Sequence, residues 1–213
     1  MLTHDSAQRG VSLIELAVAL TIMALLMASG LPSFSSWIQS GKIRTTAESI
    51  QNGLQLARAQ AVARNTLVSF YLTDTATAAC ALSATGTNWV VSLDDPSGAC
   101  NAATSDVTAP RIIQMRSAAE GSRNVELAAA VAGTPVSTIS FNGAGRVTPI
   151  PAAPITIALT NTTGGACALN PAAPPTIPPT PSGPMRCLNV IVSTGGQVRM
   201  CDTALPATDP RGC

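Results

Sequence analysis

Charged and aromatic side chains are scarce in this sequence, and histidine is nearly absent. Of its 213 residues, 11% are charged and 3% are aromatic, and the formal net charge is +1. A net charge this close to zero creates no overall field that would attract nucleic acid or an anionic lipid surface. The single histidine is His4, so the rest of the chain lacks the base for Ser-His-Asp or Cys-His catalysis and any histidine ligand for a metal. We therefore expect a protein that is not an enzyme and holds no cofactor.

The sequence also lacks a C-x-x-C motif, although it contains six cysteines. Thiolate zinc sites usually need such closely spaced pairs, so we expect three disulfides in an oxidising compartment and no metal site. A turn centred near Thr194 would place two cysteines on facing hairpin positions, where a bridge is possible. A second pair would close the loop around Trp89. The predicted pairs are Cys187–Cys201, Cys80–Cys100 and Cys167–Cys213, and other connectivities stay open.

Strongly apolar residues are concentrated in one N-terminal stretch, Val11–Leu31. Its 21 residues would form a helix about 31 Å long, close to the hydrocarbon thickness of a bilayer. We predict a leader at residues 1–10 and a transmembrane helix at residues 11–32. Arg9 precedes the stretch and no basic residue follows it until Lys42. This distribution predicts that the leader lies in the cytoplasm and the bulk of the chain outside it.

One carboxylate, Glu15, interrupts the apolar stretch. A charge near the membrane centre costs on the order of 3 kcal/mol on insertion scales. The side chain therefore either reaches the headgroups from one turn inside the membrane edge or pairs with a positive charge. At the other end of the stretch, Gly30 and Pro32 are expected to break the helix.

Beyond Pro32 the pattern predicts an amphipathic helix at residues 33–63, weakened locally by Gly41 and Gly53. Its apolar stripe would face a sheet. Residues 66–213 are predicted to be rich in β-structure, with seven prolines in an exposed loop at residues 170–184. The predicted strands are Leu67–Leu72, Trp89–Leu93, Arg111–Met115, Asn124–Leu127, Ser137–Phe141, Arg146–Thr148, Ile155–Leu159, Leu188–Ser193 and Gln197–Cys201. The fold class is α+β, with one long helix packed on an antiparallel sheet.

Three parts of the sequence resemble the GspH/FimT family of minor pilins and pseudopilins. The run Gly10-Val11-Ser12-Leu13-Ile14-Glu15, followed by Pro32, is similar to the N-terminus of the wider pilin class. The turn Ile139–Arg146 is similar to the Phe…Gly-Arg strand pair of the family. The segment from Arg186-Cys187 to Cys201-Asp202 resembles the C-terminus of FimT proteins. One departure is Val11, because pilins usually have phenylalanine at this place.

The resemblance implies cleavage between Gly10 and Val11 by a prepilin peptidase, followed by N-methylation of Val11. The apolar helix then stays on the mature chain, unlike an ordinary signal-peptide core. Glu15 becomes the fifth mature residue and pairs with the N-terminus of a neighbouring subunit, and Pro32 loosens the helix.

The resemblance also implies a location and a role. The chain would cross the inner membrane once, with residues 33–213 as a pilin globular domain in the periplasm. It would enter a filament beside other minor pilins and the major pilin. The implied role is structural, in initiation or tip assembly of a type IV pilus; the alternative is a minor pseudopilin of a type II secretion system.

Some FimT proteins also bind DNA, through a C-terminal Gly-Arg-x-Arg motif. Here Gln197 replaces the first arginine and Arg199 keeps the second. Arg186 and Arg211 lie nearby, but two aspartates and the terminal carboxylate bring the local charge to zero. Because phosphate binding grows with the number of cations, this balance favours a structural hairpin over a DNA contact.

Overall fold

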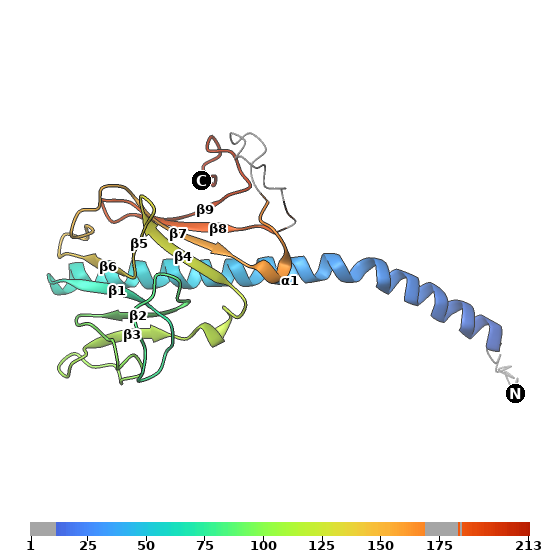
Figure 1. Ribbon diagram of the computed structural model, residues 1–213, viewed down its shortest axis with the longest axis horizontal. Helices are drawn as coiled ribbons and strands as arrows, with labels where there is room; N and C mark the ends of the chain where they lie inside the picture. Colours follow the sequence, from blue (N-terminus) through green and yellow to red (C-terminus); the bar gives the residue numbers. More distant parts are fainter. Residues whose placement is uncertain (1–11, 169–182, 184) are drawn as a thin grey trace, which may run out of the picture. The chain divides into compact units, whose positions relative to one another are not determined.

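The computed structural model describes residues 12–168, 183 and 185–213, without the side chains of residues 28–34 and 162. The helix α1 spans Leu13–Arg64, and two short 3-10 helices span Ala118–Glu120 and Thr162–Gly164 (Figure 1). The strands are β1 (Val68–Thr73), β2 (Asn88–Ser92), β3 (Ile112–Arg116), β4 (Glu126–Val131), β5 (Thr134–Pro135), β6 (Thr138–Phe141), β7 (Ile155–Thr160), β8 (Leu188–Val192) and β9 (Val198–Asp202). The chain divides into two compact units, residues 1–35 and residues 36–213.

The first unit contains the N-terminal part of α1. Ser12 precedes the helix, and its carbonyl accepts a hydrogen bond from the Leu16 amide at 3.1 Å; serine is a preferred residue at this capping position. The helix continues through Gly30 and Pro32, so the break predicted there is wrong. A proline removes only one i→i−4 hydrogen bond, and the flanking turns keep their own. Within the described residues, no helix combines the length and the apolar character needed to cross a membrane, and the span over 11–32 stays a prediction.

In the second unit, the remainder of α1 buries one apolar stripe. Its members recur at steps of three or four residues and are fully buried: Ile43, Ala47, Ile50, Leu54, Ala57 and Ala61. The helix ends at Arg64 because Asn65 takes the left-handed conformation, with a φ of 48°. The Thr66 amide then donates to the Ala61 carbonyl at 3.2 Å, the hydrogen bond of a Schellman cap. The α+β class is confirmed.

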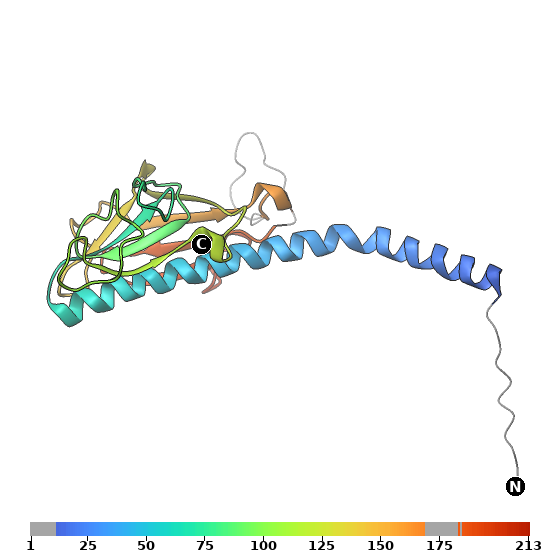
Figure 2. The same cartoon turned by 90° about the horizontal axis from the view of Figure 1, so that it is seen from below.

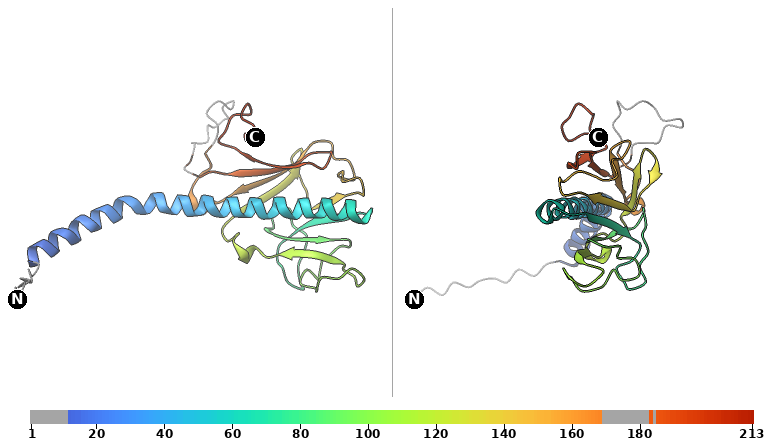
Figure 3. Two further views of the ribbon diagram at one scale, coloured as in Figure 1. Left: turned by 180° about the vertical axis from the view of Figure 1, so that it is seen from behind. Right: turned by 90° about the vertical axis from the view of Figure 1, so that its left-hand side faces the viewer.

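The strands form two antiparallel sheets, and not the single sheet predicted from the sequence. One has the order β3-β2-β1-β6 and the other β5-β4-β7-β8-β9. Figure 2 shows both sheets on the same side of α1, and Figure 3 gives further views of the same packing. Strand periodicity shows which face is buried but not which strands pair. The predicted strand Arg146–Thr148 contributes one bridge, between Val147 and Phe141.

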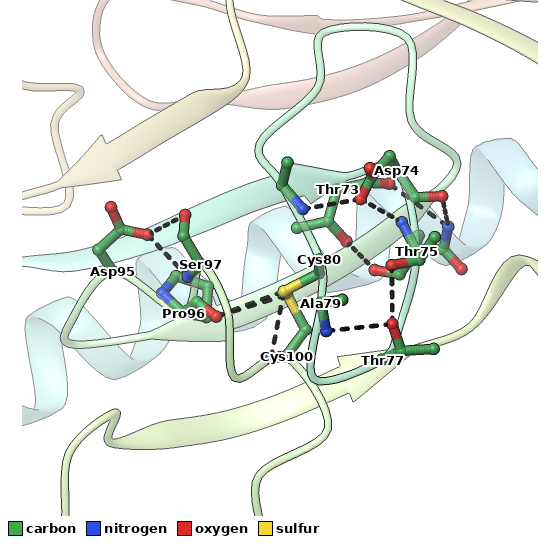
Figure 4. Close-up of a disulfide and its surroundings, with 12 residues drawn as sticks. Thr73, Asp74, Thr75, Thr77, Ala79, Cys80, Asp95, Pro96, Ser97 and Cys100 are labelled. Atoms are coloured by element: carbon green, nitrogen blue, oxygen red, sulfur yellow. Dashed lines mark hydrogen bonds between the residues drawn. A yellow bond between two sulfur atoms is a disulfide. The ribbon is translucent and has the colours of Figure 1, made fainter.

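The four-stranded sheet is covered on both faces. Every residue of β1 is buried, because its apolar residues face α1 while Tyr71 packs in a second cluster with Cys80 and Cys100. Figure 4 shows the loops that form this cover. Asp74 helps to shape them: its carboxylate accepts hydrogen bonds from the amides of Ala81, at 2.8 Å, and Thr75, at 2.6 Å. These bonds hold the pKa of Asp74 below its ordinary value.

The disulfides are Cys80–Cys100, as predicted, together with Cys167–Cys187 and Cys201–Cys213. The predicted pairs Cys187–Cys201 and Cys167–Cys213 are therefore wrong. The cause is the register of the β8–β9 hairpin, in which Val192 faces Val198 and Asn189 faces Cys201. The turn is centred at Gly195 and not near Thr194. A shift of one residue in a turn moves every facing pair by two residues, and diagonal neighbours are about 7–8 Å apart.

Candidate functional site

Apolar side chains cover the described surface of the first unit. The large apolar residues from Leu13 to Met27 are all more than half exposed, ranging from 51% at Leu16 to 86% at Leu13. Isolated exposed apolar residues need no explanation, but a continuous surface of them marks a site of contact with protein or lipid. The unit therefore presents an exposed apolar surface on one helix, of the kind that contacts protein or lipid.

Glu15 is the acidic residue of this surface. It lies in the first turn of α1, and its neighbours Ile14 and Val18 are exposed apolar residues. A carboxylate in the first turn is stabilised by the positive end of the helix dipole. In the described part of the chain no cation forms an ion pair with Glu15. Its carboxylate is therefore placed on an apolar face where a positive group of another molecule can reach it.

The structure describes the other predicted processing and assembly residues only in part. Gly10 and Val11 lie outside the described residues, as does most of the proline-rich loop at 170–184. Pro32 lies within α1, and only its backbone is described. The roles assigned to these residues stay predictions.

The structure gives each C-terminal arginine an acceptor. Arg186 pairs with Asp202, with 2.7 Å between Nη2 and Oδ2. Arg211 pairs with Asp209, with 3.3 Å between Nε and Oδ1. Hydrogen bonds from the amide and guanidinium of Arg211 hold the pKa of Asp209 below its ordinary value. Arg199 donates from Nη1 to the carbonyl of Gly212 at 3.4 Å.

Two of the four candidate DNA contacts line a groove in the second unit. Arg186 and Arg211 lie on it, whereas Gln197 and Arg199 do not. Gln197 is at the end of the β8–β9 turn, where its amide and carbonyl bond to Ser193. The four candidates therefore do not form one cationic surface.

Sequence reasoning missed the groove. It also involves α1 residues from Trp37 to Thr45, including Lys42 and Arg44. Trp37 is 73% exposed and Ile38 47% exposed, because both lie off the buried stripe of the helix. Two large apolar residues that fall outside the helical stripe were the signal that could have found this surface.

Metal-binding groups are not assembled in the described residues, where no cluster contains three or more His, Cys, Asp or Glu side chains. Each of the six cysteines is bonded to another cysteine.

Comparison with protein families gives two matches. Residues 46–196, more than half of the chain, match the family described as type II transport protein GspH. Residues 5–31 match the prokaryotic N-terminal methylation motif. The second match covers the apolar surface and Glu15. No curated protein sequence matches the chain significantly.

Among solved structures, the type IV minor pilin FimU of Pseudomonas aeruginosa is 13% identical, with a TM-score of 0.46. The alignment covers 81% of this chain and 96% of FimU. The minor pseudopilin EpsH of the Vibrio cholerae type 2 secretion system is 12% identical, with a TM-score of 0.42 over 76% of this chain and 97% of EpsH. GspH of E. coli is 13% identical, with a TM-score of 0.42 over 81% of this chain and 95% of GspH.

Proposed function

The chain belongs to the GspH family of minor pilins and pseudopilins, and on that premise we propose that it is a structural subunit that helps to start a type IV pilus. The observation that carries this proposal is the exposed apolar helix with Glu15 in its first turn. Such a surface is buried when helices of neighbouring subunits pack side by side. The role needs no catalytic residue, and we propose that the chain is not an enzyme.

Processing creates the partner for Glu15 in this scheme. We propose that a prepilin peptidase cuts after Gly10 and methylates Val11, within the segment that matches the methylation motif. The new N-terminal amine is a cation, and a neighbouring subunit would present it to Glu15. Away from water the attraction between the amine and the carboxylate is stronger than at an exposed surface, because the local dielectric constant is low. Before assembly the chain would be held in the inner membrane, with its globular part in the periplasm.

Incorporation into filaments tests the role of Glu15. The full chain with Glu15→Ala, produced in the native host, should be cleaved normally but should be strongly depleted from filaments sheared off the cells. Glu120→Ala is the matched control, because Glu120 is an exposed carboxylate of the second unit, paired with Arg116 at 3.3 Å. Immunoblots of the sheared and cellular fractions give the ratio. Equal incorporation of both variants would refute the role of Glu15, and a mature protein that begins at Met1 would refute the processing step.

A type II secretion pseudopilus is the alternative within the same family. The resemblance of the segment Arg186–Asp202 to FimT proteins favours the pilus. Deletion of the gene separates the two: loss of surface pili with normal secretion supports our proposal. Loss of protein secretion with normal pili would assign the chain to the secretion system instead.

DNA binding stays a weaker prediction. Arg186, Arg199 and Arg211 each have an acceptor within the protein, so phosphate would have to compete with carboxylates that already hold two of the three. A gel shift at low salt with the full chain in detergent is the test. If the wild-type chain shifts DNA and the Arg199→Ala variant does not, the result would support DNA binding.

A further inference from the structure

The groove of the second unit is lined by both apolar and cationic side chains. We call it the basic groove; its volume is about 950 Å³. Leu188, Met200 and Leu205 line it from β8, β9 and the C-terminal segment, and Trp37 and Ile38 line it from α1. Four of the chain's twelve cationic side chains also line it, together with one carboxylate, Asp202. The mixture indicates a ligand that is both apolar and negatively charged.

Three of the four cations are already neutralised by carboxylates. Arg186 pairs with Asp202 at 2.7 Å, Arg211 with Asp209 at 3.3 Å, and Arg44 with Glu48 at 3.0 Å. These pairs leave little free positive charge at their positions.

Lys42 is the exception among these cations. It is the only lysine of the chain, it is partly buried, and no ion pair is formed with it in the described residues. One ammonium group is thus left to bind an incoming anion beside the apolar side chains of the groove.

The C-terminal segment forms one wall of the basic groove. The disulfide Cys201–Cys213 links Cys213 to β9. The Asp202 amide donates to the Arg211 carbonyl at 2.7 Å, and Asp202 forms a parallel bridge with Gly212. Leu205 and Arg211 belong to this segment. Because the disulfide and the backbone hydrogen bonds fix the segment against β9, the groove is part of the folded domain.

We propose that the basic groove receives a protein segment of a neighbouring filament subunit, in which apolar side chains flank one carboxylate that pairs with Lys42. The proposal rests on the proposed function, since it assigns the groove to a contact between subunits. Nucleic acid fits less well, because Lys42 is the one cation of the groove without an ion pair in the described residues, and a phosphate backbone binds through several cations. The exposed Trp37 suits a protein contact, as tryptophan is enriched among residues that dominate binding.

Photo-cross-linking in the native host tests the proposal. A photoreactive amino acid at Met200, which lines the groove, should cross-link the full chain to another subunit of the filament. Lys42→Glu should lower the yield about tenfold or more, because a carboxylate would then face the incoming carboxylate. Lys42→Arg keeps the charge and should retain most of the yield.

Arg123→Glu is the matched control, because Arg123 is an exposed cation that does not line the groove; it should leave the yield unchanged. Cross-linking of Met200 to DNA or lipid, or an equal yield from the Lys42→Glu and control variants, would overturn the proposal. A chain that enters filaments but gives no cross-link at Met200 would overturn it while leaving the proposed function intact. A chain that never enters filaments would overturn the function itself.

Discussion

Replacing Gly53 by alanine should destabilise the protein, although alanine is the better helix former. Gly53 lies on the buried side of α1, and a Cβ atom there would be 2.7 Å from Cε2 of Phe70 and 3.1 Å from Cη2 of Trp89. Both rings are buried, Phe70 completely and Trp89 with 3% exposed. Their centroids are 5.5 Å apart, so neither ring has room to move away from a new methyl group.

The magnitude follows from two opposing terms. Alanine in a helix interior gains about 0.5–1 kcal/mol over glycine. Forcing an extra carbon into a well-packed core costs about 1–3 kcal/mol. The net effect of Gly53→Ala is therefore a loss of up to about 2.5 kcal/mol.

Gly41→Ala isolates the packing term. Gly41 lies in the same helix, and a Cβ atom there would meet nothing within 4 Å. This variant should gain about 0.5–1 kcal/mol from helix propensity alone. The difference between the two variants cancels the propensity, and should be about 1–3 kcal/mol of overpacking.

Urea unfolding of the full chain in mild detergent measures both variants. Tryptophan fluorescence follows unfolding through the buried Trp89, whose indole Nε1 donates to Ser49 on α1 at 3.0 Å, while the second tryptophan, Trp37, is already 73% exposed in the folded chain. Gly53→Ala should unfold at a lower urea concentration than the wild type, and Gly41→Ala at a higher one. If the two variants were equally stable, the close approach of α1 to β1 and β2 would not limit the residue at position 53.

Three further predictions follow from the loops and turns. Peptide mapping without reduction should recover Cys80–Cys100, Cys167–Cys187 and Cys201–Cys213, and a Cys187–Cys201 peptide would contradict the observed hairpin register. Gly196→Ala should destabilise the protein in thermal unfolding, because Gly196 has a φ of 82° and a Cβ atom there would collide with the Gly145 carbonyl. Gly195→Ala is the control, since a Cβ atom at that position would meet only Ser193 Oγ, at 3.8 Å. Hydrogen bonds from the Arg111 side chain and amide lower the pKa of Asp94 to about 2. Asp94 should therefore stabilise the fold above about pH 4 and lose that contribution as the pH falls towards 2. Acid titration should show a smaller loss of stability over this window for Asp94→Asn, and identical titration curves would contradict the assignment.

The sequence alone determined the elements and the family. The apolar stripe of α1 was readable because helical periodicity is a local property, repeated every three or four residues from Ala47 to Ala61. Most strands were readable for the same reason, since alternation and turn residues act within a few positions. Glu15 stood out because a lone carboxylate in an apolar run is costly and needs a reason.

Tertiary structure alone decided which strands pair, how four of the cysteines are bonded, and where the basic groove lies. These features depend on residues far apart in sequence: Trp37 and Lys42 on α1 meet Met200 on β9 only after both pack on the core. A register is fixed by burial on both strands at once, and an error of one residue in the turn at Gly195 was enough to exchange the disulfide partners of Cys187 and Cys201. Local pattern sets the elements, because short-range sterics and burial act on neighbours, while pairing is chosen by the packing of the whole domain.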